Sequence, residues 1–132
     1  MAANPIWPSV GRIGVAAVST ANTNRDGTGT IVDILTGAAA GTRLDRIVIQ
    51  TTNDPADSVM TLFIHNGTSY FLFDEVDLGN PAAASTTVPG FRYAQKYENL
   101  ILPSASFKFA AAITVALTAG VMNVFAFGGD LT

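Results

Sequence analysis

The sequence predicts an all-β protein folded as an antiparallel β-sandwich, with a jelly roll as the favoured architecture and an immunoglobulin-like sandwich as the alternative. Three observations lead to this prediction. Short β-rich segments alternate with turn residues along the chain, and helical patterns are almost missing. The one alanine-rich piece, residues 37–41, is bracketed by glycines and is too short to propagate a helix. About eight to ten strands separated by turns are typical of a two-sheet sandwich.

The expected strands follow from β-rich runs that end at turn residues. We expect strands at residues 12–20, 30–35, 43–51, 60–64, 69–73, 91–97, 99–102, 107–115 and 121–127. Pro81, Pro89 and Pro103 mark strand boundaries, because proline cannot sit inside a central ladder. The clearest local signal is Asn66-Gly67 between two apolar runs, which predicts a tight hairpin with a type I′ turn.

Composition indicates one domain that shares its surface with partners. The 132 residues suffice for one domain with a sizeable core, and there is no cysteine. We divide the chain into an extended N-terminal arm, residues 1–11, and a single sandwich domain, residues 12–132. Only 13% of residues are charged, against about 25% in most soluble proteins. A surface so poor in charge predicts contacts with a partner or with copies of the same chain.

Charge and motifs argue against nucleic-acid binding and catalysis. The formal net charge of −3, with 7 Lys and Arg against 10 Asp and Glu, does not favour a phosphate-binding face. His65 is the one histidine and falls at the hairpin turn, and no serine lies in a nucleophile elbow. Asp74, Glu75 and Asp77 alternate along one strand and so do not face each other across a cleft. We therefore expect no enzyme activity and no cofactor.

A loop between the first two expected strands resembles a calcium-binding loop in spacing. Oxygen-bearing side chains stand at its positions one, three, five and twelve, and a glycine stands at position six; these side chains are Asn22, Asn24, Asp26 and Asp33. Asparagine replaces the usual first aspartate, and aspartate replaces the bidentate glutamate. With two ligand charges, calcium affinity would be weak, so an ordinary Asn/Asp/Gly loop is the preferred interpretation and no metal site is expected.

The N-terminal arm is the candidate partner-binding element. Pro5 and Pro8 restrict the backbone around Ile6 and Trp7 to extended conformations, which places the only tryptophan outside the strands. Tryptophan is among the commonest interface anchors, so we predict partner binding through Pro5, Ile6, Trp7 and Pro8. Packing of Trp7 on its own sandwich is the alternative to packing on a neighbouring subunit or host surface.

Neither a secretory signal nor a membrane span is expected. The first eight residues lack a basic segment and contain two prolines. Residues 109–129 carry no charge over about the length of a bilayer span. Thr114, Thr118 and Asn123 interrupt this run, and a Thr-Ala-Gly turn divides it into two alternating pieces, so two strands are the better interpretation.

Several stretches resemble the small structural proteins of tailed-bacteriophage heads, the capsid decoration or cement proteins. The resemblance spans about residues 41–130 and is carried by strand-and-turn patterning, in Gly41-Thr-Arg-Leu-Asp-Arg-Ile-Val-Ile49, Thr61-Leu-Phe-Ile-His-Asn-Gly-Thr68, Leu72-Phe-Asp-Glu-Val76, Asn99-Leu-Ile-Leu-Pro103 and Asn123-Val-Phe-Ala-Phe-Gly-Gly-Asp130. It implies a β-sandwich that forms homotrimers on the capsid exterior and binds the major capsid protein. The chain differs from the better-known decoration proteins in lacking a long N-terminal tail rich in glycine and proline.

A receptor-binding or carbohydrate-binding module of a phage tail or fibre is the main alternative function. Tyr70, Tyr93 and Tyr97 are the candidate aromatic platform for a glycan, although cross-strand packing explains them equally well. An RNA-binding coat protein is less favoured because such coats usually carry a basic arm. We therefore expect a virion protein whose partners are capsid protein and copies of itself, with no nucleic acid and no membrane.

Overall fold

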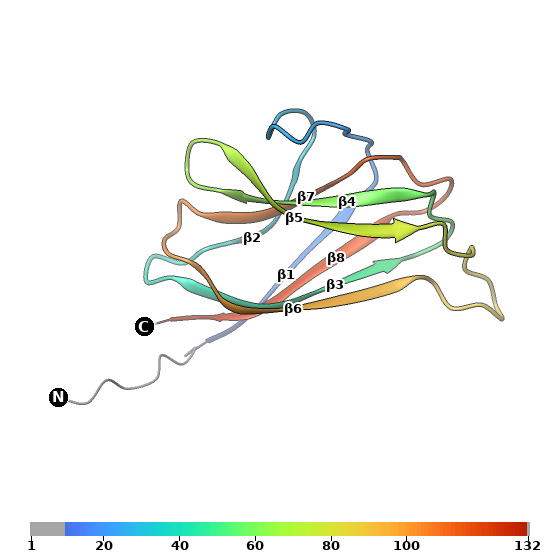
Figure 1. Ribbon diagram of the computed structural model, residues 1–132. Helices are drawn as coiled ribbons and strands as arrows, with labels where there is room; N and C mark the ends of the chain where they lie inside the picture. Colours follow the sequence, from blue (N-terminus) through green and yellow to red (C-terminus); the bar gives the residue numbers. More distant parts are fainter. Residues whose placement is uncertain (1–9, 132) are drawn as a thin grey trace.

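Two four-stranded antiparallel sheets make up the protein (Figure 1). The structure is a computed structural model, and it describes residues 10–131. The strands are β1 (Val10–Val18), β2 (Val32–Thr36), β3 (Thr42–Thr51), β4 (Ser58–His65), β5 (Tyr70–Gly79), β6 (Arg92–Leu102), β7 (Lys108–Ile113) and β8 (Met122–Asp130). One sheet, here sheet A, has the order β1-β8-β3-β6, and the other, sheet B, has the order β2-β7-β4-β5. The predicted antiparallel β-sandwich is confirmed.

The strands pair as one long hairpin that is folded across itself. The first strand pairs with the last, the second with the seventh, the third with the sixth and the fourth with the fifth. Successive pairs alternate between the two sheets. This nested order favours the jelly-roll prediction over the immunoglobulin-like alternative, whose sheets contain strands ABED and CFG.

The core lies between the sheets and follows the two-residue alternation of the strands. Every second side chain of the central strands is fully buried, as Ile47 and Ile49 of β3 and Val124 of β8 show. Two large aromatic side chains, Phe63 and Phe109, are also fully buried, on opposite faces of sheet B. At about 25 cal/mol per Å² of apolar surface, this burial is the main stabilising contribution.

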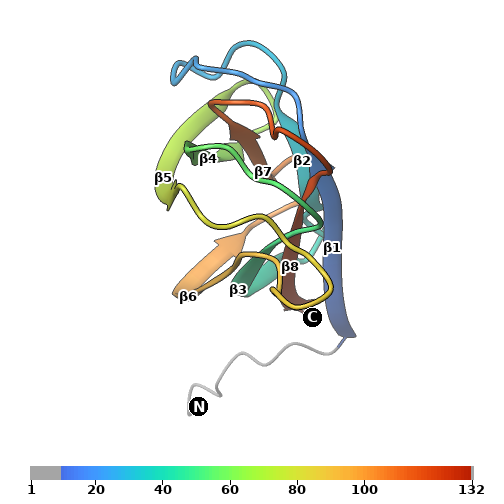
Figure 2. The same cartoon turned by 90° about the vertical axis from the view of Figure 1, so that its right-hand side faces the viewer.

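The two sheets lie close together at the β1 and β2 edges and further apart at the β5 and β6 edges, where side chains bridge them (Figure 2). We call the first pair of edges the closed side and the second pair the open side. On the closed side, β1 approaches β2 so tightly that a Cβ atom at Gly14 would lie 2.2 Å from the carbonyl oxygen of Ile34. Only glycine allows this contact. On the open side, a hydrogen bond from the Tyr97 hydroxyl of β6 to Asp74 Oδ2 of β5, 2.9 Å long, joins the sheet edges.

Several strand boundaries differ from the prediction, most of all in β5, which continues to Gly79 instead of ending at residue 73. β1 begins at Val10, two residues before the expected start of the domain at residue 12. The strands expected at residues 91–97 and 99–102 form one strand, β6. The polar break at Glu98 and Asn99 is a bulge, because Asn99 has φ 57° and the register with β3 shifts at this point. A bulge bends a strand without ending it. Because polar residues occur in bulges as well as in turns, the sequence alone suggested that the strand ended here.

The predicted hairpin between β4 and β5 is confirmed, but its predicted type I′ turn is wrong. Such a turn needs positive φ at both central residues, and of the two only Gly67 has it, at 97°. Four residues separate the last register pair, His65 and Tyr70. The Asn66 Oδ1 atom accepts hydrogen bonds from the backbone N–H groups of Thr68 and Ser69, both 3.0 Å long. The Asn66 side chain thus stabilises a loop of four residues, where the Asn66-Gly67 dipeptide had predicted a loop of two.

The uncharged stretch 109–129 is divided between strands β7 and β8, as expected. The connection between them contains Gly120 with φ 80°. Within residues 10–131, no helix has the length and apolar character needed to cross a membrane.

Replacing Gly67 by valine should destabilise the protein by about 1–3 kcal/mol, because a β-branched residue resists positive φ. A Cβ atom there would also lie 3.1 Å from Ser106 Cβ. Gly11→Val is the matched control, because Gly11 lies in β1 and a Cβ atom added to it would meet nothing within 4 Å. Urea unfolding of both variants measures the difference. Equal unfolding midpoints would contradict the strain argument.

Candidate interaction surface

The outward face of sheet A carries four rows of side chains that run across all four strands. The alternate residues of the same strands point inward to the buried core. Register pairing places the outward residues side by side from β1 through β8 and β3 to β6. The rows are Gly11, Gly129, Arg43 and Ile101; Ile13, Phe127, Arg46 and Lys96; Val15, Phe125, Val48 and Ala94; and Ala17, Asn123, Gln50 and Arg92.

The centre of this face is aromatic. The rings of Phe125 and Phe127 stack with centroids 6.2 Å apart and an interplanar angle of 14°. The guanidinium carbon of Arg46 lies 4.9 Å from the centroid of the Phe127 ring, within the range of a cation–π contact. Both rings are half-buried, although they point away from the core.

The face changes from apolar to cationic from one edge to the other. At the β1 edge, Ile13 is 63% exposed and Val15 is 53% exposed. At the β6 edge, Arg92 and Lys96 are both exposed. Four of the seven Lys and Arg residues lie in the four rows, and no Asp or Glu does. An apolar centre with arginine beside it has the composition of a protein–protein interface.

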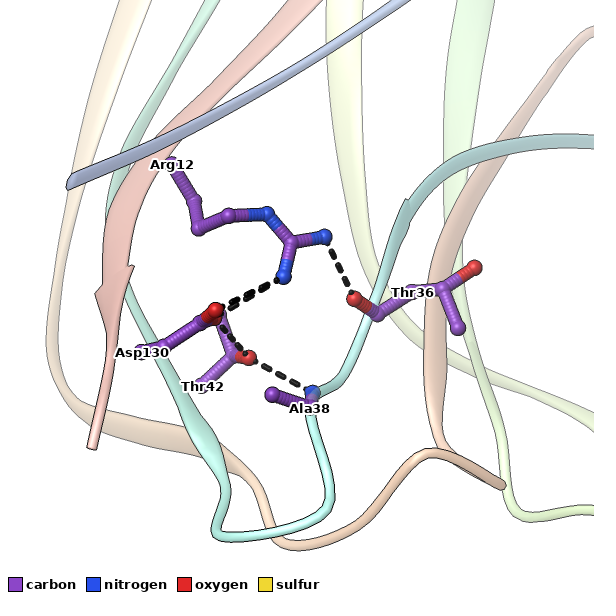
Figure 3. A network of polar contacts seen from close by, with 5 residues as sticks. All are labelled: Arg12, Thr36, Ala38, Thr42 and Asp130. Atoms are coloured by element: carbon purple, nitrogen blue, oxygen red, sulfur yellow. Dashed lines mark hydrogen bonds and ion pairs between the residues drawn. The ribbon is translucent and has the colours of Figure 1, made fainter. Parts of the chain in front are cut away.

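A polar network fixes the start of β1 (Figure 3). Arg12 Nη1 donates to both carboxylate oxygens of Asp130 in β8, at 2.9 and 3.1 Å, and Nη2 donates to the Thr36 carbonyl in β2 at 2.9 Å. The Thr42 hydroxyl donates to Asp130 Oδ1 at 2.8 Å and accepts from the Ala38 N–H group at 2.8 Å. The network joins strands of both sheets at the point where the chain enters the domain.

These hydrogen bonds shift the titration of Asp130. Its pKa is lowered from the ordinary value of 3.8, first by the hydrogen bond from Thr42 and then by Arg12, while desolvation opposes the shift. Sequence reasoning missed this network. Arg12 and Asp130 are 118 positions apart, and only the pairing of the first and last strands brings them together.

The predicted partner-binding residues Pro5, Ile6, Trp7 and Pro8 lie outside the residues that the structure describes. Their role stays a prediction.

The calcium-loop-like motif folds as a strap over the outer face of sheet B. We use the term strap for residues 22–31. The buried Asn22 side chain holds it: Nδ2 donates to the carbonyls of Thr28 and Thr30, each at 2.9 Å, and Oδ1 accepts from the Asn24 N–H group at 3.0 Å. Asp26 Oδ1 accepts from the N–H and hydroxyl groups of Thr28. Two of the motif's side-chain oxygens, those of Asn22 and Asp26, therefore accept hydrogen bonds from within the strap.

The fourth candidate ligand, Asp33, does not join the other three. Its Oδ1 accepts a hydrogen bond of 2.7 Å from the Tyr70 hydroxyl, and its Oδ2 lies 3.4 Å from Lys108 Nζ. Within residues 10–131, no three His, Asp or Glu side chains gather as a metal would require.

The strap covers a second apolar cluster, on the face of sheet B that points away from sheet A (Figures 1 and 2). Phe63, Ala110 and Ala112 are buried there, with Ile31 packed against them. A Cβ atom at Gly27 would lie 2.3 Å from the Tyr70 carbonyl oxygen, so the strap meets β5 at a glycine. Arg25 of the strap forms an ion pair with Glu75 of β5.

Of the three candidate glycan-platform tyrosines, Tyr70 lies apart from Tyr93 and Tyr97, which stand near each other on β6. Tyr70 packs with the second cluster, and its pKa is raised to about 12 by desolvation and by Asp33. Tyr93 and Tyr97 pack instead against the main core, and their hydroxyls donate to Gln95 at 2.8 Å and Asp74 at 2.9 Å. Burial and Asp74 raise the pKa of Tyr97 well above its usual value. Cross-strand packing therefore accounts for these residues, and they form no shared platform.

His65 and the acidic residues of β5 make local structural contacts. His65 Nδ1 accepts from the Gly67 N–H group at 3.0 Å, and its ring meets the Tyr70 ring edge-on. Asp74 faces Tyr97 of the other sheet, whereas Glu75 faces the strap. A shallow depression of about 410 Å³ lies beside them, lined by Leu72, Phe73, Asp74 and Glu75.

A comparison with solved structures finds the same fold in a phage capsid. A chain of the acid-stable capsid structure of Helicobacter pylori bacteriophage KHP30 superposes with a TM-score of 0.54 at 12% identity, covering 93% of this chain and 89% of that one. At this identity the likeness is one of fold. No protein-family model matches the chain, and a search of curated proteins finds no match.

Calcium should leave the melting temperature unchanged, because the Oδ1 atoms of Asn22 and Asp26 already accept hydrogen bonds from the strap and Asp33 bonds to Tyr70 instead. Differential scanning calorimetry with millimolar calcium, and then with excess chelator, tests this. A rise of several degrees that chelator reverses would show a calcium site in the strap.

The Asp130 network should contribute stability that depends on acid. Because the folded pKa lies below 3.8, the contribution is complete above that pH and is lost as the pH falls through the folded pKa. Asp130→Asn should therefore lower the melting temperature at pH 7 and reduce its dependence on pH below 4. Asp45→Asn is the control, because Asp45 is exposed and pairs with Arg43, two positions away on the same strand. Identical pH profiles for wild type and Asp130→Asn would contradict the assignment.

Proposed function

We propose that the protein is a structural component of a phage capsid, which decorates the shell from outside and stabilises it through protein–protein contacts. The observation that carries this proposal is the fold shared, over nearly the whole chain, with a chain of a phage capsid structure. A role in binding, rather than in catalysis, is consistent with the absence of a catalytic constellation in the sequence.

The nested strand order supports the finer proposal of a jelly roll, an architecture that viral capsid domains use repeatedly. The low charge of the chain and the apolar rows of sheet A support a surface shared with other subunits. The partners that we propose are the major capsid protein and two further copies of this chain in a trimer.

The receptor- or glycan-binding alternative has less support. Tyr70 is separated from Tyr93 and Tyr97, and the hydroxyls of all three donate hydrogen bonds to other side chains. The shallow depression beside Phe73 is a feature that would suit a sugar, and glycan-array binding by a monomer would favour that function.

The direct test uses shells of the capsid-forming protein that is encoded with this chain, assembled without it. The purified protein should co-sediment with the shells, appear on their exterior by electron microscopy, and raise the temperature at which they open. Light scattering should show a trimer in solution. A monomer that fails to co-sediment would overturn the proposal.

Deletion of residues 2–8 should abolish binding to such shells and leave the melting temperature of the domain nearly unchanged. The reason is that Trp7 would lose a contact worth about 1.5–3 kcal/mol, multiplied over many copies on the shell. Trp7→Ala should act mainly through a faster dissociation rate, and Trp7→Phe should retain part of the binding.

The same deletion separates the two interpretations of the arm. A truncated protein that unfolds, or that binds shells as well as the intact chain, would show that the arm is a structural clasp on its own domain.

A further inference from the structure

We propose that the outward face of sheet A is the docking surface for an acidic protein partner, one that presents an apolar patch with carboxylates on one side of it. This inference rests on the proposed function and names the surface and the partner chemistry through which it would operate.

The first argument is the unpaired apolar half of the face. Ile13 and Val15 are more than half exposed, beside the stacked rings of Phe125 and Phe127. The outer face of sheet B offers a contrast within the same molecule, because there Phe63 is completely buried, with Ile31 of the strap and Tyr70 and Leu72 of β5 packed against its cluster. Among residues 10–131, the chain thus covers one outer sheet face with its own side chains and leaves apolar side chains of the other face exposed, as a surface for a partner would be.

The second argument is charge. The rows hold four cations, in a chain whose formal net charge is −3, and the exposed carboxylates of Asp45 and Glu98 lie in the bulge that interrupts the pairing of β3 with β6. Arg43 is paired with Asp45 at 2.7 Å, and Arg46 lies over the Phe127 ring. Among residues 10–131, Arg92 and Lys96 take part in no ion pair. The complementary surface therefore carries carboxylates opposite the β6 edge.

The third argument excludes a second copy packed through the same face. A two-fold dimer places each patch against itself, with rows running parallel or antiparallel. One arrangement sets Arg92 and Lys96 against their own copies, and the other buries them against Ile13 and Val15. Like charges in contact, and charges desolvated without a partner, both cost free energy.

The fourth argument is continuity with the arm. β1 is the edge strand that carries Ile13 and Val15, and residues 1–9 precede it directly. A partner bound to the predicted anchor residues 5–8 is therefore within reach of the same edge. The two contacts would act together, since linked contacts raise affinity beyond either alone.

Zero-length cross-linking tests the inference, because Lys96 and Lys108 are the two lysines of the chain and lie on different sheets. A carbodiimide joins a lysine amine to a carboxylate in contact with it, as an amide. On shells with bound protein, mass spectrometry should find Lys96 joined to Asp or Glu of the capsid protein. Lys108, which lies on sheet B beside Asp33, should give no such product.

Matched substitutions give an independent measure. Arg92→Gln together with Lys96→Gln should weaken shell binding about tenfold and reduce its dependence on salt. Lys108→Gln is the control and should leave binding nearly unchanged. Ile13→Ser should also weaken binding, whereas Val115→Ser, which changes an exposed valine outside the rows, should not. Circular dichroism melts confirm that each variant is folded.

The outcomes separate the two proposals. Two results would overturn the sheet A docking surface and leave the capsid role standing. In the first, wild-type protein binds shells but cross-links to them through Lys108. In the second, the sheet A variants bind shells as well as the wild type does. If Lys96 cross-links to carboxylates of another copy, the occupant is the chain itself and the inference is overturned. If wild-type protein binds no shells and instead binds RNA or DNA through Lys96 and Arg92, both proposals fail.

Discussion

The pairing of the first strand with the last is the constraint on which the rest of the structure depends. β1 and β8 form an uninterrupted register from Val10 and Asp130 to Val18 and Met122. The other three strand pairs of the nested hairpin are formed by residues between these two strands in the sequence. The β1–β8 pair therefore joins the first and last strands of the sandwich to each other. Such pairing joins residues more than a hundred positions apart, and topologies dominated by non-local contacts fold slowly. Arg12 and Asp130 hold the two strands together at their common end, and Arg12 also ties them to β2 of the other sheet.

The two sheets solve the same physical problem differently. Each has a buried face and an outer face, and each outer face carries apolar side chains. On sheet B, residues 22–31 cover these side chains, with Asn22 satisfying the strap's own backbone and Arg25 bound to Glu75. Sheet A has no corresponding cover among residues 10–131. Its β6 edge instead carries cations, which keep a lone protein soluble and discourage self-association through that face.

The local pattern of the sequence predicted the strands, and the missing information is long-range. Two-residue alternation and turn residues located all eight strands, although β5 continues six residues beyond its expected end and β6 was expected as two strands, and Asn66-Gly67 located the hairpin between β4 and β5. The register of β1 against β8, and with it the contact of Arg12 with Asp130, depends on packing that no local window contains. The rows of sheet A were invisible for the same reason, since each takes one residue from each of four strands. The spacing of Asn22, Asn24, Asp26 and Asp33 suggested metal ligands. Asn and Asp are also the residue types whose side chains accept backbone hydrogen bonds in loops, so the sequence does not distinguish the two roles.

The nested pairing also has a mechanical consequence. Val10 and Asp130 are register partners, so both ends of the sandwich leave it at the same end of one antiparallel pair. A force that pulls these ends apart acts across the ladder and loads its hydrogen bonds one pair at a time, instead of sharing the load along the strands. The Arg12–Asp130 ion pair, with Thr42 behind it, stands near the first pair to be loaded. Resistance of the domain to being peeled open is therefore concentrated in a few polar atoms at its edge.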